Sequence, residues 1–238
     1  MLGPPLQPLP APEPTTGRLV EGWWSAVVSG RGMVVPDGAV DLLWSPRAGP
    51  FVAGPDVEPR PVELTPGDRL VGVRLRAGVA AQLLGIGLDR VTGQAIALDA
   101  VLAPGELDRL GDRLATAEPP AAQAWALTEA LDRWIPDDWE PDREVTAALV
   151  ALRSDRPIEP GGIGDRQLRR RFTASLGFGP AFYRRLVRLD RFTELLDRWP
   201  ERSLGELAAS AGYADQAHLG RDCRRLLDTT PGRLRHAA

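Results

Sequence analysis

The chain has 238 residues, 43% hydrophobic and 26% charged, which is ordinary for a globular protein and leaves room for two domains. Its single cysteine, Cys223, excludes an internal disulfide framework, and its two histidines make no zinc-finger set with it, so no metal or other cofactor is expected. Since no apolar run approaches about 18 residues and the start does not resemble a signal peptide, we expect a cytoplasmic protein without a membrane partner.

The net charge of −3 conceals a difference between the two parts of the chain. Residues 141–238 contain 18 Arg and 13 acidic residues, whereas residues 1–140 contain 11 Arg and 19 acidic residues. Phosphate neutralisation supplies most of the sequence-independent affinity of proteins for DNA. A basic carboxy-terminal part beside an acidic part therefore favours DNA binding by the former alone.

Residues 1–17 are rich in proline and predict a disordered tail, because proline joins neither helices nor central strands. Short β-like runs follow, separated by clusters of glycine and proline; they cover 23–28, 40–44, 51–53 and 69–76. In the last run Val71, Val73 and Leu75 share one face, as in a strand with one side toward water. The pattern predicts a small antiparallel barrel or sandwich.

Helices are predicted after these strands, over 77–84, 104–117 and 121–135. Their leucine stripes either pack on each other or pair with a second copy of the chain, and packing within the chain is the commoner case. The run 135–142 is rich in Pro and Asp and marks a boundary, after which a helix resumes to 153. We therefore expect an α+β protein with a β-rich domain over 18–136 and an all-α domain over 142–238.

Residues 203–227 carry the punctuation of two helices joined by a tight turn. Ser203 and Glu206 suit a capping box, Gly212 the left-handed conformation that ends a helix, and Asp215 the cap of the next. Leu219, Cys223, Leu226 and Leu227 fall on the buried face of the second helix, and Gln216, Ala217, Gly220, Arg221 and Arg224 point elsewhere. The position of Cys223 on this face therefore favours a core residue over a redox sensor. Glutamine and arginine on the other face can read base edges in the major groove, as in a helix-turn-helix.

Two stretches resemble the DNA-binding domain of AraC/XylS-type transcriptional regulators: residues 212–221 with Thr229-Thr230-Pro231, and residues 165–172 with Gly177-Phe178-Gly179-Pro180. Residues 180–199 resemble the family's linker helix, which at about 30 Å would hold two reading heads near one turn of DNA apart. The resemblance implies a sequence-specific transcriptional regulator whose partner is double-stranded DNA. The residues expected to bind DNA are Arg166, Arg169, Arg170, Gln216, Ala217, His218, Arg221, Arg224 and Arg225.

The first of these motifs departs from the family where its support helix should lie. Residues 156–164 contain two prolines and three glycines, which oppose a helix. The first recognition helix is then expected to be held by residues 142–153 and by the linker helix. The alternative is that the damaged module is a protein-interaction domain without sequence-specific DNA binding, with acidic and basic parts mating within a dimer.

Residues 35–44, Gly54-Pro55 and residues 72–76 are similar to an uncharacterised domain that is found fused to AraC-type modules. By analogy with the family's sensor domains it would bind a small-molecule effector or mediate dimerisation; the candidate pocket residues are Trp23, Trp24, Trp44 and Arg74. Tryptophans on strands are more often core residues, and we favour that interpretation. Asp37 and Asp41 invite acid/base chemistry, but no nucleophile, metal set or catalytic histidine accompanies them, so we do not expect an enzyme.

Overall fold

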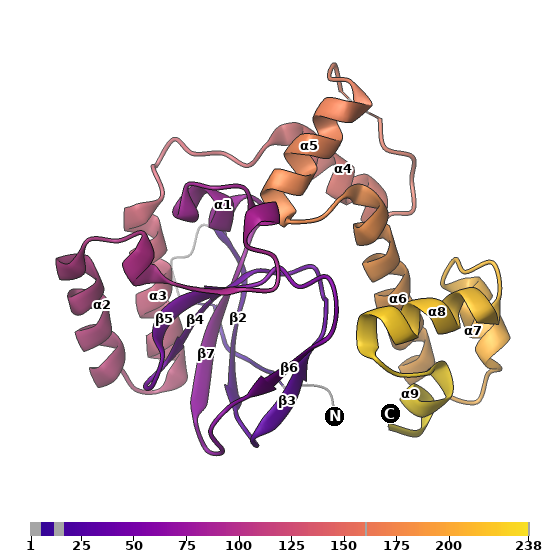
Figure 1. Ribbon diagram of the computed structural model, residues 1–238, viewed down its shortest axis with the longest axis horizontal. Helices are drawn as coiled ribbons and strands as arrows, with labels where there is room; N and C mark the ends of the chain where they lie inside the picture. The colour runs from indigo at the N-terminus through magenta and orange to yellow at the C-terminus, as the bar shows by residue number, and fades with distance from the viewer. Residues whose placement is uncertain (1–5, 12–16, 160, 238) are drawn as a thin grey trace.

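The computed structural model describes residues 6–11, 17–159 and 161–237 and has the α+β fold that the sequence predicts (Figure 1). Its strands are β1 (Gln7–Pro8), β2 (Val20–Val27), β3 (Arg31–Val34), β4 (Asp41–Ser45), β5 (Gly49–Ala53), β6 (Arg60–Glu63), β7 (Arg69–Leu75) and β8 (Ala95–Ala97). Six of them form an antiparallel sheet in the order β1-β2-β7-β4-β5-β8, and β3 pairs with β6 in a separate sheet.

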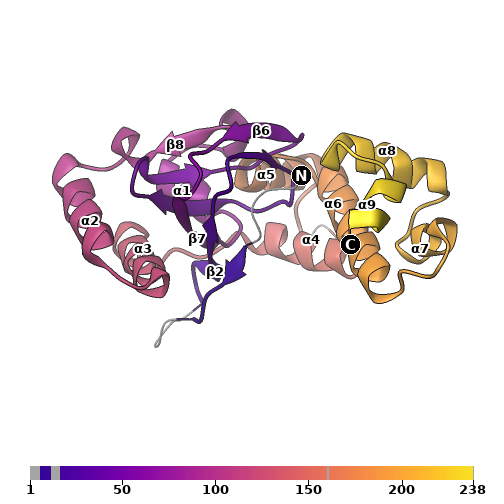
Figure 2. The same cartoon turned by 90° about the horizontal axis from the view of Figure 1, so that it is seen from below.

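The helices divide between the two ends of the molecule. The amino-terminal part, residues 17–139, contains α1 (Val79–Leu84), the 3-10 helices η1 (Leu88–Arg90) and η2 (Leu98–Ala100), α2 (Pro104–Thr116) and α3 (Pro120–Trp134). The carboxy-terminal part, residues 142–237, contains α4 (Arg143–Arg153), α5 (Asp165–Leu176), α6 (Pro180–Arg198), α7 (Leu204–Ser210), α8 (Gln216–Leu227) and α9 (Pro231–Ala237). Seen from below, α2 and α3 lie at one end of the molecule and α7, α8 and α9 at the other (Figure 2). None of the helices within the described residues is both long and apolar enough to span a membrane.

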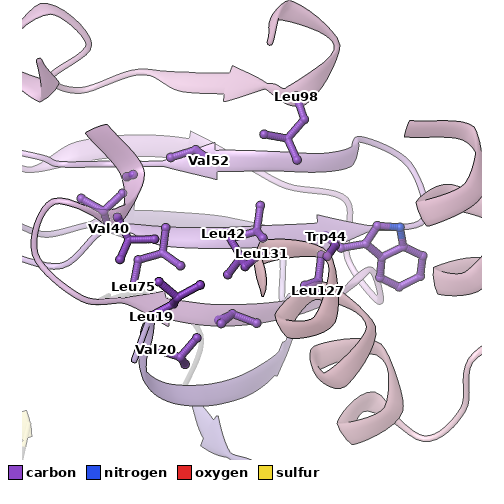
Figure 3. Packing of buried hydrophobic residues seen from close by; sticks show 14 of the residues in the cluster. Leu19, Val20, Val40, Leu42, Trp44, Val52, Leu75, Leu98, Leu127 and Leu131 are labelled. Carbon is purple, nitrogen blue, oxygen red and sulfur yellow. The ribbon is translucent and has the colours of Figure 1, made fainter. Parts of the chain in front are cut away.

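The main core lies between the six-stranded sheet and α3. Alternate residues of a strand point to the same face, and Leu42, Val71 and Val73 are completely buried on the face toward the helices. Leu127 and Leu131 of α3 pack into the same cluster, where Figure 3 shows them beside the strands. Burial of each such side chain contributes about 1.5 to 3 kcal/mol. The leucine stripe of α3 is therefore used within the chain.

A second hydrophobic cluster lies in the carboxy-terminal part and is formed by side chains of α4 to α8. Phe172 of α5, Phe192 of α6 and Leu207 of α7 are completely buried in it. Two residues of the amino-terminal part, Val57 and Ala77, also pack against this cluster. The two parts of the chain therefore share apolar contacts as well as a connector.

The strands extend beyond the segments that the sequence predicts. Residues 7–8, assigned to a disordered tail, pair with β2 as Gln7 with Ser25 and Pro8 with Trp24. Pro8 is compatible with this position because β1 is an edge strand, where one missing amide leaves no ladder bond unmade. The remainder of the expected tail, residues 1–5 and 12–16, lies outside the described residues. Strands β3, β6 and β8, of three or four residues each, were not predicted.

Candidate nucleic-acid interface

The second motif forms the helix-turn-helix that its punctuation predicts. Ser203 accepts a hydrogen bond from the Glu206 amide at 3.2 Å, and the Glu206 carboxylate accepts one from the Ser203 amide at 2.9 Å. The Ser203 hydroxyl also donates to the Glu206 carboxylate at 2.8 Å, and this bond, followed by the one from the Ser203 amide, lowers the pKa of Glu206. After α7, Gly212 has φ of 88°, the left-handed conformation that glycine adopts at little cost. Asp215 then caps α8 by accepting from the His218 amide at 2.6 Å. Both helices of the motif thus begin at side-chain caps.

Helix α8 has one buried face and one face open to solvent. Leu219, Cys223 and Leu226 are completely buried, as predicted. On the open face, exposed side chains follow one another along the helix: Gln216, Ala217, Arg221, Arg224 and Arg225. His218 is half-buried, and its ring stands edge-on to the Tyr213 ring with centroids 5.1 Å apart. Its contacts are therefore with the turn of the motif.

Two residues of α8 that the sequence does not place in the core are buried. Gly220, expected to point away from the core, is buried, and so is Asp222, which is 5% exposed. Burial and then the charge of Asp222 raise the pKa of the Tyr213 hydroxyl well above its usual range. The same two causes raise the pKa of the Cys223 thiol to about 12. Cys223 is thus a protonated core residue at neutral pH.

Helix α5, the expected first recognition helix, also has a buried and an open face. Leu168, Phe172 and Leu176 recur every four residues and are buried in the carboxy-terminal cluster. Its exposed arginines are Arg166, Arg169 and Arg170. Among the residues that the structure describes, none of these three pairs with an acidic side chain, whereas Arg171 pairs with Asp142 of the α4 cap at 3.3 Å. The open face therefore carries uncompensated positive charge.

No helix precedes α5 where a support helix would lie. The described residues between α4 and α5, 154–159 and 161–164, form turns and bends, in agreement with their proline and glycine content. Helices α4 and α6 contact α5, as expected, but so do α1 and η1 of the amino-terminal part. The sequence held no signal for this last contact.

A single helix, α6, joins the two motifs (Figure 1). Pro180 stands in its first turn, where a missing amide costs no helical hydrogen bond. Its buried face is formed by residues that the sequence predicts, namely Tyr183, Leu186, Leu189, Phe192 and Leu196. Leu195, also predicted to be buried, is half-buried. Nineteen residues give it a length of about 28 Å. This length agrees with the expected linker helix, and the spacing of the two reading heads on DNA stays a prediction.

The candidate effector residues do not form one site. Trp44 is buried in the main core, the Trp23 indole donates to Thr128 at 2.9 Å, and Trp24 lies over Gly72 so closely that an added Cβ would come within 2.2 Å of the Trp24 ring. Of the four candidate residues, only Arg74 lines the cavity of about 750 Å³ that lies between the amino-terminal part and helices α4 and α6. The tryptophans are thus structural residues, as the sequence interpretation favoured.

Arg74 is held in that cavity by two carboxylates. Its guanidinium donates to Asp37 at 2.7 Å and to Asp41 at 3.3 Å. Burial lowers the pKa of Arg74, but the charges of Asp41 and Asp37 more than offset this and leave it raised. Across the cavity Arg153 of α4 donates to the Tyr183 hydroxyl of α6 at 2.6 Å. Asp37 and Asp41 therefore neutralise an arginine in this structure.

Helix α7, the Gly212 turn and helix α8, linked by α6 to the first candidate recognition helix, α5, define the carboxy-terminal part as a helix-turn-helix domain with two candidate recognition helices. Residues 161–237 match a family described as a helix-turn-helix domain, and residues 11–97 match a family described as a domain of unknown function, DUF6597. The chain therefore carries an AraC-type helix-turn-helix domain at its carboxy terminus and a DUF6597 domain before it, which confirms the resemblance seen in the sequence.

One curated relative is the HTH-type transcriptional regulator MtrA of Neisseria gonorrhoeae. It is 29% identical over 99 residues, which are 42% of this chain and 28% of MtrA. The chain thus matches less than a third of the length of that relative. A crystal structure of an apo ToxT variant from Vibrio cholerae superposes over 92% of this chain and 95% of ToxT, with 9% identity and a TM-score of 0.43, a likeness too weak to bear on function.

Proposed function

We propose that the protein is a sequence-specific DNA-binding transcriptional regulator made of two domains, residues 18–136 and 142–238. The observation that carries this proposal is the pair of open helix faces on α5 and α8, whose exposed arginines form no ion pair within the described part of the chain and which also present Gln216. Arginine binds guanine through two hydrogen bonds and glutamine binds adenine in the same way. A long connecting helix supports simultaneous contact of both faces with successive major grooves.

Within this proposal Gln216 and Arg221 read base edges, because they project from the amino-terminal half of α8, the half that enters the groove in helix-turn-helix proteins. Arg166, Arg169 and Arg170 play the corresponding part on α5. Arg224 and Arg225 stand in the last turn of α8, where contacts with phosphate are expected. His218 supports the turn through Tyr213.

The test is selection of genomic fragments by the purified protein in the presence of excess non-specific competitor, followed by sequencing of what is retained. A recurrent site is expected. Arg221→Ala should then weaken binding to that site by about 1 to 3 kcal/mol and relax base preference at one position, because a bidentate base contact is lost. The matched control is Arg133→Ala, which removes an exposed arginine from α3, in the amino-terminal part. Equal affinities for the Arg221→Ala and Arg133→Ala variants would contradict the assignment of Arg221.

A small-molecule effector is proposed for the cavity of about 750 Å³ that Arg74 lines. This cavity is bounded by the amino-terminal part on one side and by the α4–α6 side on the other, so a ligand inside it would contact both. Residues of both charges line it, among them Asp37, Arg153 and Asp190. That lining supports a polar ligand, and Arg74→Ala, with the same change at Arg133 as control, tests whether the response to a candidate effector depends on the cavity.

A further inference from the structure

The two recognition helices differ in what holds them. Helix α8 is preceded by α7, a support helix with its own capping box. Helix α5 is preceded by turns and bends in residues 154–159 and 161–164. A recognition helix without a neighbour on one side would leave apolar surface open to water, which costs about 25 cal/mol per Å². Something else must cover that side of α5.

The amino-terminal part packs against the carboxy-terminal end of α5, in van der Waals contact at Ala174 and more closely at Gly177. Gly87, just before η1, lies so near α5 that an added Cβ would stand 3.5 Å from both the Cα and the Cβ of Ala174. Gly177, which ends α5, lies so near Pro55 that an added Cβ would stand 2.2 Å from the Pro55 Cγ and 3.2 Å from the Leu88 carbonyl oxygen. No larger residue fits at position 177 in this arrangement. Figure 1 shows the carboxy-terminal end of α5 against the amino-terminal part beside α1.

A polar contact accompanies this packing. The Thr92 hydroxyl, in the turn after η1, lies 3.3 Å from the Leu88 carbonyl oxygen and 3.4 Å from the Gly177 carbonyl oxygen, and its single proton is shared between these two acceptors. Gly177 caps the carboxy-terminal end of α5, so a donor to its carbonyl oxygen ties this cap to the amino-terminal part. The amino-terminal part thus supplies both apolar and polar contacts to the turn that follows the first recognition helix.

The approach of the amino-terminal part to the second recognition helix, α8, is of another kind. The loop of residues 57–59 faces the end of α8 across a hollow of about 770 Å³, lined also by Phe182, Arg224 and Arg225. The caps and the support helix of α8 all lie within residues 203–227. Displacement of the amino-terminal part would therefore remove contacts from the carboxy-terminal end of α5, at Ala174 and Gly177, and leave the α7–α8 motif intact.

We propose that the amino-terminal part takes the place of the missing support helix, so that the first recognition helix is a composite of both parts of the chain. This inference rests on the proposed function in so far as α5 reads DNA. It follows that the amino-terminal part controls one of the two reading heads by holding it in place. A ligand or partner that shifts η1 changes the order of α5 and the affinity for one half of the site.

The test is a wedge at Gly87 in the full-length protein. Gly87 has φ of −66° and ψ of 137°, a conformation open to any residue, so Gly87→Leu strains no backbone torsion. Its Cβ would stand 2.6 Å from the Asp89 Oδ1 and 3.5 Å from Ala174, and the longer side chain pushes on both. The matched control is Gly111→Leu in α2, where an added Cβ meets nothing within 4 Å. Thr92→Val removes the hydrogen bond to Gly177 without adding bulk, and provides a second variant if the wedge disturbs the sheet.

Amide hydrogen exchange is the first measurement, because it needs no DNA. We expect exchange in α5 to be at least about tenfold faster in Gly87→Leu than in the wild type, and faster to a smaller degree in Thr92→Val, with α8 and β7 unchanged. Gly111→Leu should match the wild type throughout. If α5 keeps its wild-type protection in both Gly87→Leu and Thr92→Val, the composite head is ruled out.

Footprinting on the selected site is the second measurement. The wild type should protect two successive major grooves, and Gly87→Leu should lose protection in one groove only. Protection of both grooves by Gly87→Leu would overturn the inference while leaving the proposed function standing. No footprint from the wild type would overturn the proposed function, and the exchange result would still decide whether the amino-terminal part holds α5.

Discussion

Asp222 and Cys223 are neighbours on the buried side of α8, directly behind its open face. One oxygen of the Asp222 carboxylate and the Tyr213 hydroxyl are buried without a hydrogen-bond partner among the described residues. A buried polar group without a partner costs about 1 to 3 kcal/mol, so these groups reduce the stability of the second motif. The carboxylate also acts on its neighbour, since its charge adds to the rise in the pKa of Cys223.

The chemical consequence is an inert thiol. Only the thiolate is nucleophilic, and a pKa of about 12 leaves almost none of it at neutral pH. We expect Cys223, the only cysteine in the chain, to resist a thiol reagent such as 5,5′-dithiobis(2-nitrobenzoate) at pH 8 in the folded protein and to react at once in urea. The urea sample serves as the control. Stoichiometric labelling of the native protein within seconds would revive the redox interpretation.

Some of this arrangement could be predicted from the sequence and some could not. The buried face of α8 is predicted by Leu219, Cys223 and Leu226, because they are apolar and recur at helical spacing. Asp222 follows Leu219 by three residues and precedes Leu226 by four, so it shares that face in position, but a carboxylate is rarely buried without a partner. Spacing alone therefore places Asp222 on the buried face, whereas its residue type favours an exposed position.

At the scale of elements, the capping box makes α7 the part of the second motif whose stability is easiest to test. Ser203→Ala removes the side chain that accepts from the Glu206 amide and should destabilise the motif by about 1 kcal/mol. Urea denaturation followed by circular dichroism at 222 nm gives the free energy of unfolding. The control is Ser210→Ala, an exposed serine at the end of the same helix, which should change it by less than about 0.5 kcal/mol. Equal losses from both variants would mean that the cap contributes little.

Helices were predicted more fully than strands, and the reason is length. Helix α6 repeats its apolar spacing over 19 residues, whereas β8 has three residues and β3 and β6 have four. So short a strand cannot show an alternation, and its pairing depends on a partner distant in the chain. The docking of α5 was unpredictable for the same reason. It depends on Gly87 and Gly177, which are 90 positions apart. In a sequence, a glycine indicates a turn or the end of a helix, but it does not indicate what packs against it.

At the scale of the whole molecule, the distribution of charge matters more than its sum. We expect the logarithm of the DNA association constant to fall linearly with the logarithm of salt concentration, with a slope of about −0.9 for each phosphate neutralised. Fluorescence anisotropy at a series of KCl concentrations gives the slope. Arg225→Ala should reduce its magnitude by about 1 and leave base preference unchanged, whereas Arg133→Ala should not alter it. A slope near zero for the wild type would favour the protein-interaction module instead.

The uninterrupted linker helix also limits which promoters the protein can bind with both recognition helices. Because α6 is one helix of 19 residues, the distance between the two recognition helices is fixed by a rigid element and not by a flexible loop. Each base pair inserted between two half-sites moves them about 3.4 Å apart and turns one around the DNA axis, which a rigid protein cannot follow. Promoters that hold both half-sequences at another spacing would be invisible to this protein. The specificity of the protein for its DNA site would then depend on the spacing of the half-sites as well as on their base sequence.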